Sequence, residues 1–393
     1  MRFPEFSGEW EKHSLGEIGS TLIGLTYSPA DVVKEDGVIV LRSSNIQDGE
    51  IDYKDLVRVN KKIKDSLFTK KNDILICARN GSSRLIGKNA LISDDDTGHS
   101  YGAFMMMYRS EDNPFVRQLL CTKRYFAQVG ENLGARINQI TTSDMNSFEF
   151  FFPQSKEERH KVASFLRLID ERISTQKKII EDLKKLKDAI NNSLHNNINE
   201  FQLFSFNELG NDYSGLTGKS SDDFGSGLPY ISYLNVFRND IVTDEPFECV
   251  KVSKTEKQNI VSYGDLLFTL SSETPSEVGI GAIYLGKTNP IYLNSFCFGV
   301  HLSNQENIYG PYLAYFVTSQ YFRKTILPFA QGSTRYNLMK SDFMKHKFRF
   351  PNMATQKAIY NALHTLSEKI QNEEVCLNKY TEQKQCLLAR LFI

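Results

Sequence analysis

The chain has 393 residues, more than a single hydrophobic core usually supports, so its length predicts two or more domains. It carries 47 basic and 47 acidic side chains, a formal net charge of zero, so any role with nucleic acid would have to come from local basic clusters. With 40% hydrophobic and 24% charged residues, the composition excludes a disordered tail or a collagen-like fibre.

Nothing in the sequence indicates export or membrane insertion. The N-terminus has no apolar core like that of a signal peptide, and no stretch approaches the ~18 consecutive apolar residues of a membrane span. The six cysteines are scattered, and none stands in a C-x-x-C pair. We therefore expect free thiols, a cytoplasmic location and no membrane partner.

The first part of the chain, residues 1–153, is predicted to form a β-rich domain. Short alternating or β-branched runs at 38–41 and 74–77 are broken by Gly, Asn, Asp and Ser, as is typical of strands. A helix is expected over 114–125, where a proline stands at the helix start. The domain closes on an aromatic strand that ends at Pro153.

After Pro153 the hydrophobic period changes from 2 to 3.5, which predicts a long helix over 154–197. Ser155 and Glu158 have the spacing of a capping box, in which the serine accepts a backbone N–H and the glutamate reaches back. At 1.5 Å per residue a helix of about 40 residues extends roughly 60 Å, which indicates a spacer. Its lysines are more typical of a solvated face than of a DNA-facing stripe.

The second part of the chain repeats the first in the same order, which predicts an internal duplication. The matching segments are 24–26 with 215–217, 39–46 with 230–236, 73–75 with 265–267, 86–90 with 278–282, 134–138 with 332–337, and 148–153 with 348–351. A second β-rich domain is therefore expected over 198–351, with a helix at 311–322, and a second spacer helix over 352–393. The apolar seam of the two long helices comprises Ile169, Ile173, Ile180, Leu183, Ile190, Leu366, Ile370, Leu377 and Leu387.

No motif in the chain specifies an enzyme. Residues 215–220 resemble a phosphate-binding loop, but the glycine required five residues before Gly218 is Tyr213. Asn289-Pro290-Ile291-Tyr292 resembles a motif with which amino-methyltransferases hold a flipped base, but no cofactor-binding fold is indicated beside it, and we interpret it as a turn. The histidines and cysteines lack the spacing of metal ligands. We expect no catalytic residue, no metal site and no cofactor in this chain.

The polar side chains that do repeat are those suited to reading bases and phosphates. They lie in matching loops of the two copies, although a hydrophilic surface loop is an equally good interpretation of any one of them. The candidate DNA-binding residues are Arg42, Ser43, Asn45, Arg79, Asn80, Arg84, Arg136, Asn138 and Gln139 in the first copy, and Tyr233, Asn235, Ser272, Thr274, Gln331, Ser333, Thr334, Arg335, Tyr336 and Lys340 in the second.

A β-rich domain, a strand ending in Phe-Pro and a long helix, all given twice, resemble the specificity subunit of type I restriction-modification systems. The specific part of the resemblance lies in the helices, in residues 157–166 and 169–173 of the first, and in 355–359, 366–370 and 386–392 of the second. It implies an α+β fold of two mixed, β-rich target recognition domains joined by two long antiparallel coiled-coil helices with pseudo-twofold duplication.

The resemblance also implies a function without an active site. Each recognition domain would read one half of a bipartite, asymmetric site in double-stranded DNA, and the helices would set the spacer and dock two methyltransferase subunits. S-adenosylmethionine, ATP and Mg²⁺ would be bound by those subunits and by two restriction-translocase subunits. Two alternatives stay open: the DNA-reading subunit of a type IIB-like methyltransferase-nuclease, and a coiled-coil scaffold for protein interactions that binds no DNA.

Overall fold

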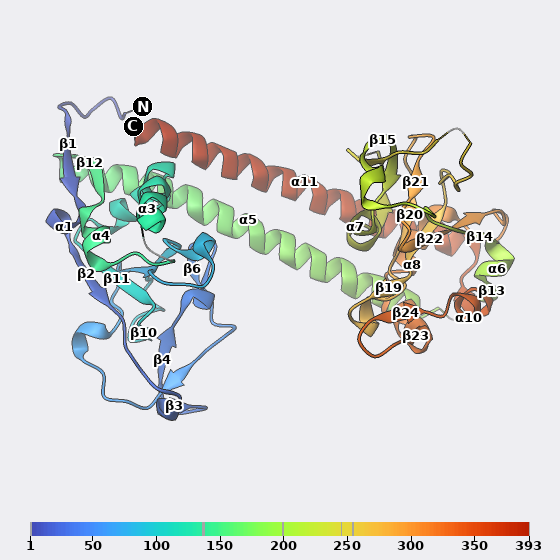
Figure 1. The fold of residues 1–393 in the computed structure, drawn as a ribbon, viewed down its shortest axis with the longest axis horizontal. Helices are drawn as coiled ribbons and strands as arrows, with labels where there is room; N and C mark the ends of the chain where they lie inside the picture. Colours follow the sequence, from blue (N-terminus) through green and yellow to red (C-terminus); the bar gives the residue numbers. More distant parts are fainter. Residues whose placement is uncertain (1, 136–137, 199, 245, 254, 393) are drawn as a thin grey trace. The chain divides into compact units, whose positions relative to one another are not determined.

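A computed structural model of the chain describes residues 2–135, 138–198, 200–244, 246–253 and 255–392. The chain divides into two compact units, unit 1 with Met1–Lys177 and Val375–Ile393, and unit 2 with Lys178–Glu374. Each unit combines a β-rich domain with segments of two long helices, α5 (Lys156–Asn196) and α11 (Met353–Leu391), which Figure 1 traces in green and red. Within the described ranges, no helix is both long and apolar enough to cross a membrane.

The β-rich part of unit 1 contains three main sheets. The central one has the order β2 (Ser20–Ile23), β11 (Met105–Arg109), β8 (Ile74–Cys77), β9 (Asn89–Leu91), and all its pairings are antiparallel. A second sheet has the order β10 (Ser100–Tyr101), β4 (Val38–Leu41), β7 (Arg58–Val59), β3 (Val32–Val33), and β10 runs parallel to β4. Strand β1 (Trp10–Ser14) pairs with β12 (Glu149–Pro153), the aromatic strand before α5. The helices are α1 (Leu15–Ile18), α2 (Asn113–Leu119), α3 (Lys123–Ala135) and α4 (Thr142–Ser147).

Unit 2 repeats this arrangement. Its central sheet has the order β14 (Gly210–Ser214), β22 (Cys297–Leu302), β18 (Leu266–Thr269), β20 (Gly281–Tyr284), β16 (Ile241–Val242). Strand β15 (Phe224–Ile231) lies between β17 (Glu248–Val250) and β21 (Tyr292–Leu293), and runs parallel to β21. Strand β13 (Gln202–Ser205) pairs with β25 (Lys347–Phe350). A small sheet joins β19 (Ser271–Ser272), β24 (Tyr336–Leu338) and β23 (Ala330–Gln331), and the helices are α6 (Phe206–Leu209), α7 (Tyr233–Arg238), α8 (Leu313–Phe316), α9 (Gln320–Ile326) and α10 (Lys340–Lys345).

The repeated strand order confirms the predicted duplication and the mixed α+β class. Strands β2, β11, β8 and β9 correspond in order and direction to β14, β22, β18 and β20. The parallel pairs β4–β10 and β15–β21 also correspond. Both short helices that follow the first strand, α1 and α6, begin with a serine capping box, at Ser14 and Ser205.

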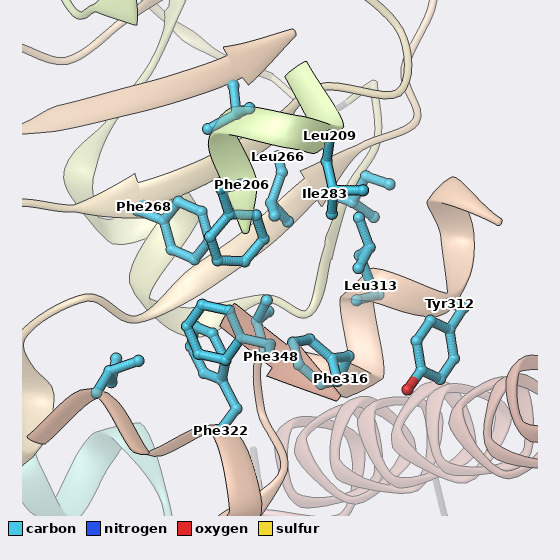
Figure 2. Packing of buried hydrophobic residues seen from close by; sticks show 14 of the residues in the cluster. Phe206, Leu209, Leu266, Phe268, Ile283, Tyr312, Leu313, Phe316, Phe322 and Phe348 are labelled. Atoms are coloured by element: carbon cyan, nitrogen blue, oxygen red, sulfur yellow. The ribbon is translucent and has the colours of Figure 1, made fainter. Parts of the chain in front are cut away.

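Aromatic packing holds the long helices to the domain of unit 2. Phe206, Phe322 and Phe348 are fully buried, with ring centroids 5.1 Å apart for Phe206–Phe348 and 5.2 Å for Phe322–Phe348. Figure 2 shows these rings gathered with Phe268 and Phe316. Ile359 and Leu363 of α11 belong to the same cluster, and Ile190 and Leu194 of α5 pack against it. Because hydrophobic stabilisation follows buried apolar area, this shared core fixes both helix segments to the sheet of unit 2.

A second cluster does the same in unit 1. Val162 and Leu166 of α5 and Leu388 and Leu391 of α11 are buried with Phe150 and Phe152 of β12. Trp10 lies 6.1 Å from the ring of Phe392, so the end of α11 packs on the first strand of the chain. The aromatic strand before each long helix is therefore the element that anchors it.

Within each unit, α5 and α11 run antiparallel. In unit 1, Lys384 forms an ion pair with Asp170, and Arg172 donates to the hydroxyl of Tyr380 over 2.6 Å, so residue numbers fall on one helix as they rise on the other. In unit 2, Lys184 lies 2.6 Å from Glu374. Of the nine seam residues, Ile180 and Ile370 are buried, and the others are half-buried: Ile169, Ile173, Leu183, Ile190, Leu366, Leu377 and Leu387.

The capping box predicted at the start of α5 forms only in part. The hydroxyl of Ser155 accepts the backbone N–H of Glu158 at 3.2 Å. The carboxylate of Glu158 does not reach back, because Arg2 donates to both of its oxygens at 2.7 Å and Trp10 donates to one at 3.3 Å. The buried carboxylate thus ties the N-terminal segment to α5 instead of closing the helix start.

The single helices predicted over 114–125 and 311–322 are each interrupted. Thr122 stands between α2 and α3, and its hydroxyl accepts the N–H of Tyr125 at 3.3 Å. Ser319 likewise caps α9, and its hydroxyl accepts the N–H of Phe322 at 3.2 Å. A hydroxyl that caps a new helix competes with continuation of the old one, so these two residues were the sequence signal for the breaks.

A buried histidine in α5 makes the stability of unit 2 depend on pH. His195 stacks on Tyr312 at 5.4 Å, and burial lowers its pKa to about 4 although its Nδ1 is bonded to the carbonyl of Asn191. The unfolded chain binds the proton near pH 6.5, so the contribution of the neutral ring is present above that pH and is lost as the pH falls from 6.5 towards 4. The lowered pKa corresponds to a change of about 3 kcal/mol in the free energy of unfolding.

We expect His195→Gln to flatten the pH dependence of the free energy of unfolding between pH 6.5 and 4, because the titrating group is removed. Denaturant unfolding at pH 7 and pH 4.5 measures this. The control is His160→Gln, which removes an exposed histidine from the same helix and should leave the slope unchanged. An equal pH dependence in wild type and His195→Gln would contradict the assignment.

Candidate functional site

The same backbone turn joins the parallel strand to the central sheet in both units. In unit 1 the turn is 102–104, between β10 and β11, and in unit 2 it is 294–296, between β21 and β22. The N–H of Met105 donates to Gly102 at 2.8 Å, and that of Cys297 donates to Asn294 at 3.0 Å. We call these two segments the paired turns.

A repeated glycine presses against each turn. The N–H of Gly24 donates to Met105 and that of Gly215 donates to Cys297, both at 3.1 Å. A Cβ on Gly24 would lie 2.2 Å from the carbonyl oxygen of Gly102, and a Cβ on Gly215 would lie 2.0 Å from that of Asn294. These contacts leave no room for a side chain, which explains why both copies have a glycine here.

Each turn also supports a neighbouring loop from an earlier part of its unit. In unit 1 the carbonyl of Phe104 accepts the N–H groups of Ala78 and Arg79, each at 3.0 Å. In unit 2 the carbonyl of Phe296 accepts the N–H of Leu270 at 2.8 Å. The paired turns therefore hold the loops after β8 and β18, where candidate polar residues were predicted.

In unit 1 the structure brings together candidate residues from three segments. Arg79 and Gln139 form an isolated antiparallel bridge. The side-chain amide of Asn80 donates to the hydroxyl of Ser43 at 2.9 Å, and that of Asn138 donates to the carbonyl of Gly81 at 2.9 Å. Arg79 is exposed, and its guanidinium lies 5.7 Å from the centre of the exposed ring of Phe104. We call Ser43, Arg79, Asn80, Asn138 and Gln139 the unit 1 cluster.

A hollow of about 120 Å³ lies beside this cluster. Arg79, Gln139 and Thr142 supply its polar edge, and Ile23, Met105 and Met106 supply apolar walls. Ile23 is 58% exposed, so the hollow opens onto an apolar as well as a polar surface.

The remaining first-copy candidates do not belong to the unit 1 cluster. Arg42 is half-buried and forms an ion pair with Asp55 at 2.7 Å, whereas Arg84 is exposed in a short 3₁₀ turn, 83–85. Asn45 was also predicted to contact DNA, and the structure places it in the interior of unit 1. It is fully buried, its amide donates to the carbonyls of Asp52 and Asp55, and its oxygen accepts the N–H of Arg42. Arg136 lies outside the described residues.

In unit 2 the equivalent cluster is built on the small sheet. Ser271 pairs with Asn337 and Ser272 with Tyr336, and the hydroxyl of Tyr233 donates to the carbonyl of Ser271 at 3.0 Å. The N–H of Leu338 donates to Leu270 as that of Ile140 does to Ala78, so the ladder places Asn337 opposite Ser271 as Gln139 lies opposite Arg79. The repeat is therefore offset by one residue from the sequence match, and the counterpart of Asn138 is Tyr336.

The exposed part of this second surface is the loop that leads into β24. Gln331, Ser333, Thr334 and Arg335 are all exposed, and Tyr336 is half-buried. The guanidinium of Arg335 lies 5.1 Å from the centre of the Phe296 ring. We call Gln331, Ser333, Thr334, Arg335 and Tyr336 the unit 2 cluster.

Four second-copy candidates have local partners. The oxygen of Asn235 accepts from the hydroxyl and the N–H of Ser232 and so caps α7, and Lys340 pairs with Asp212 at 2.5 Å. Ser272 is buried and donates to Glu277 at 2.8 Å. Ser272 was predicted as a DNA contact, and in this structure its hydroxyl is engaged inside unit 2. Hydrogen bonds from Ser272 and the exposed Thr274 hold the pKa of Glu277 below its usual range, which keeps a fixed negative charge beside the loop.

Sequence reasoning missed two exposed phenylalanines of these surfaces. Phe104 is 60% and Phe296 51% exposed, each at the third position of its turn. The signal was present, because Phe104 and Phe296 occupy the same place in the two copies, directly before β11 and β22.

The comparisons with known proteins agree with this duplicated arrangement. A family model described as type I restriction modification DNA specificity domain matches residues 7–200 and again 199–380. The EcoKI type I restriction enzyme specificity subunit of Escherichia coli (strain K12) is 24% identical over 296 residues, 69% of this chain. The StySPI type I restriction enzyme specificity subunit of Salmonella potsdam is 25% identical over 199 residues, 46% of this chain. These matches span 63% and 41% of the two relatives' lengths.

Two solved structures have the same fold. The S subunit of a type I restriction-modification system from M. genitalium superposes with a TM-score of 0.58 at 18% identity, covering 100% of this chain and 99% of that one. A second chain, from work on complex assembly and conformational transition of the type I R-M system, gives a TM-score of 0.56 at 14% identity and covers 98% of both chains.

We expect Gly24→Ala to destabilise unit 1 by about 1–3 kcal/mol, because a methyl group would collide with backbone atoms of the turn that cannot move cheaply. Thermal unfolding measures the change. The control is Gly130→Ala in α3, where nothing lies within 4 Å of the added carbon, and where alanine should stabilise by roughly 0.5–1 kcal/mol. Equal effects of the two substitutions would show that the close approach is unimportant.

Proposed function

This chain belongs to the type I restriction-modification DNA specificity family, and from that membership we propose that it is the non-catalytic, DNA-reading subunit of a type I restriction-modification complex. Residues 1–153 and 198–351 would be its target recognition domains, and each would read one half of a bipartite site in double-stranded DNA. The observation that carries this proposal is the repeated surface of turn, exposed arginine and polar loop, found once in each unit.

The chemistry of the two clusters suits base reading. Arginine bonds bidentately to guanine, and glutamine and asparagine to adenine. Among the exposed members, Arg79 stands on a loop that is hydrogen-bonded to its paired turn, and Gln331 is paired in a short ladder. Arg335 lies in the short connection between the two strands of that ladder. Rigid mounting matters, because a side chain that is ordered before binding loses less entropy when it meets a base.

The proposed spacer is the pair of long helices, 154–197 and 352–393. Helix α5 is continuous over 41 residues, and its two ends are anchored in different cores. A helix changes length in steps of 1.5 Å per residue, so its length would fix which half-site spacing the complex accepts.

The proposed partners carry the chemistry that this chain lacks. Two methyltransferase subunits would bind S-adenosylmethionine, and two restriction-translocase subunits would use ATP and Mg²⁺. The assembly would act in the cytoplasm. Among the residues that the structure describes, no group of three or more His, Cys, Asp or Glu side chains is placed to hold a metal ion.

Co-expression with a type I methyltransferase subunit from the same host tests the function. We expect a stable complex that methylates adenine in one bipartite sequence, identified by methylome sequencing of the host. Its affinity for DNA should fall steeply with rising salt, because phosphate contacts release counterions. A host without this chain is the control. No stable complex and no adenine methylation would rule out the proposed function.

Replacement of one arginine should affect one half-site. We expect Arg335→Ala to cost about 1–3 kcal/mol of binding and to relax base preference only in the half-site read by unit 2. The matched control is Arg349→Ala, because Arg349 is also exposed and lies 5.0 Å from an exposed ring, that of Phe201, outside the unit 2 cluster. Selection from randomised half-sites measures base preference. Loss of preference in both half-sites, or with Arg349→Ala alone, would contradict the assignment.

A further inference from the structure

The two exposed phenylalanines of the paired turns lie outside the buried apolar clusters of their units. Phe104 and Phe296 are 60% and 51% exposed, while their neighbours Met105 and Cys297 are buried almost completely. Leaving a phenylalanine in water forgoes most of the stabilisation that its burial would provide. One such residue needs no explanation, but the same residue at the same position of both copies does.

The backbone around each ring is fixed. The turn closes on itself, its last carbonyl accepts a bond from the loop after β8 or β18, and the repeated glycine packs against it. The rings therefore project from rigid mounts and not from free loops. A rigid, exposed aromatic ring beside polar side chains is the arrangement expected of a contact residue.

The neighbours of each ring indicate what it contacts. Arg79 lies over Phe104 and Arg335 over Phe296, at 5.7 and 5.1 Å from the ring centres. A guanidinium occupies one ring face, so insertion of that face between stacked bases is hindered, and the ring edge and opposite face remain available. In the major groove, the apolar feature that a base presents is the C5-methyl group of thymine, and guanine offers two acceptors to an arginine.

We propose that Phe104 and Phe296 are specificity-determining residues, each in contact with a thymine methyl group in the half-site read by its own unit, beside a guanine bonded by the stacked arginine. This inference rests on the proposed function and deepens it. The arginine and the phenylalanine then recognise adjacent bases together, because the stacked ring limits the orientations that the guanidinium can adopt.

Deoxyuridine tests this contact directly, since it differs from thymidine only by the missing methyl group. The assembled complex of the full chain with its methyltransferase subunits is titrated with duplexes carrying the site found by methylome sequencing. Each thymine is replaced in turn by deoxyuridine, and dissociation constants are measured at one salt concentration. For wild type, we expect one replacement in each half-site to weaken binding roughly fourfold, the effect of one buried methyl group.

The same titrations with variants assign each contact. Phe104→Ala should bind the thymine and deoxyuridine duplexes equally in one half-site and stay sensitive in the other, and Phe296→Ala should show the reverse. The matched controls are Phe126→Ala and Phe201→Ala, which remove rings that are 46% and 42% exposed elsewhere in units 1 and 2. They should keep the wild-type pattern.

The outcomes separate this inference from the function on which it rests. If wild type prefers its site but no deoxyuridine replacement weakens binding, or if the variants keep the sensitivity, the contact is overturned while the proposed function stands. If the wild-type complex shows no preference between its site and a scrambled duplex, the proposed function itself fails.

Discussion

The close approach of a glycine to a backbone turn is the constraint on which both candidate surfaces depend. Gly24 and Gly215 lie so near the paired turns that an added Cβ would meet a carbonyl oxygen at 2.2 and 2.0 Å. The paired turns accept hydrogen bonds from the loops after β8 and β18, and these loops carry or adjoin the polar clusters. If the glycine were replaced, the turn would have to move, and the exposed arginine and phenylalanine would move with it.

The anchoring of the long helices fixes each β-rich domain to the proposed spacer. Each unit buries part of α5 and part of α11 in the same aromatic core as its closing strand, β12 or β25. A recognition surface is thus attached to a helix segment through closely packed rings, and a closely packed core has low compressibility. This attachment is what the proposed spacer function requires, because a helix can set a spacing only if its ends are held firmly.

Much of this could be predicted from residue order alone. The duplication was visible because glycines, strands and the Phe-Pro end recur in register, and the long helices because their apolar residues repeat every 3.5 positions. Hydrogen-bond partners were not visible in that way. Asn45 and Ser272 are polar residues in predicted loops, yet tertiary packing buries both. The carboxylate of Glu158 accepts hydrogen bonds from Arg2, which is 156 residues away in sequence. Local patterns carry no information on such distant partners.

Photo-crosslinking tests the central claim most directly, that each unit reads its own half of one DNA site. A benzoyl-phenylalanine placed at position 104 or 296 of the full chain, assembled with its methyltransferase subunits, reacts with whatever lies against the ring. The account predicts crosslinks from position 104 to one half-site and from position 296 to the other, mapped by primer extension. Crosslinks from both positions to the same half-site, or to protein only, would contradict it.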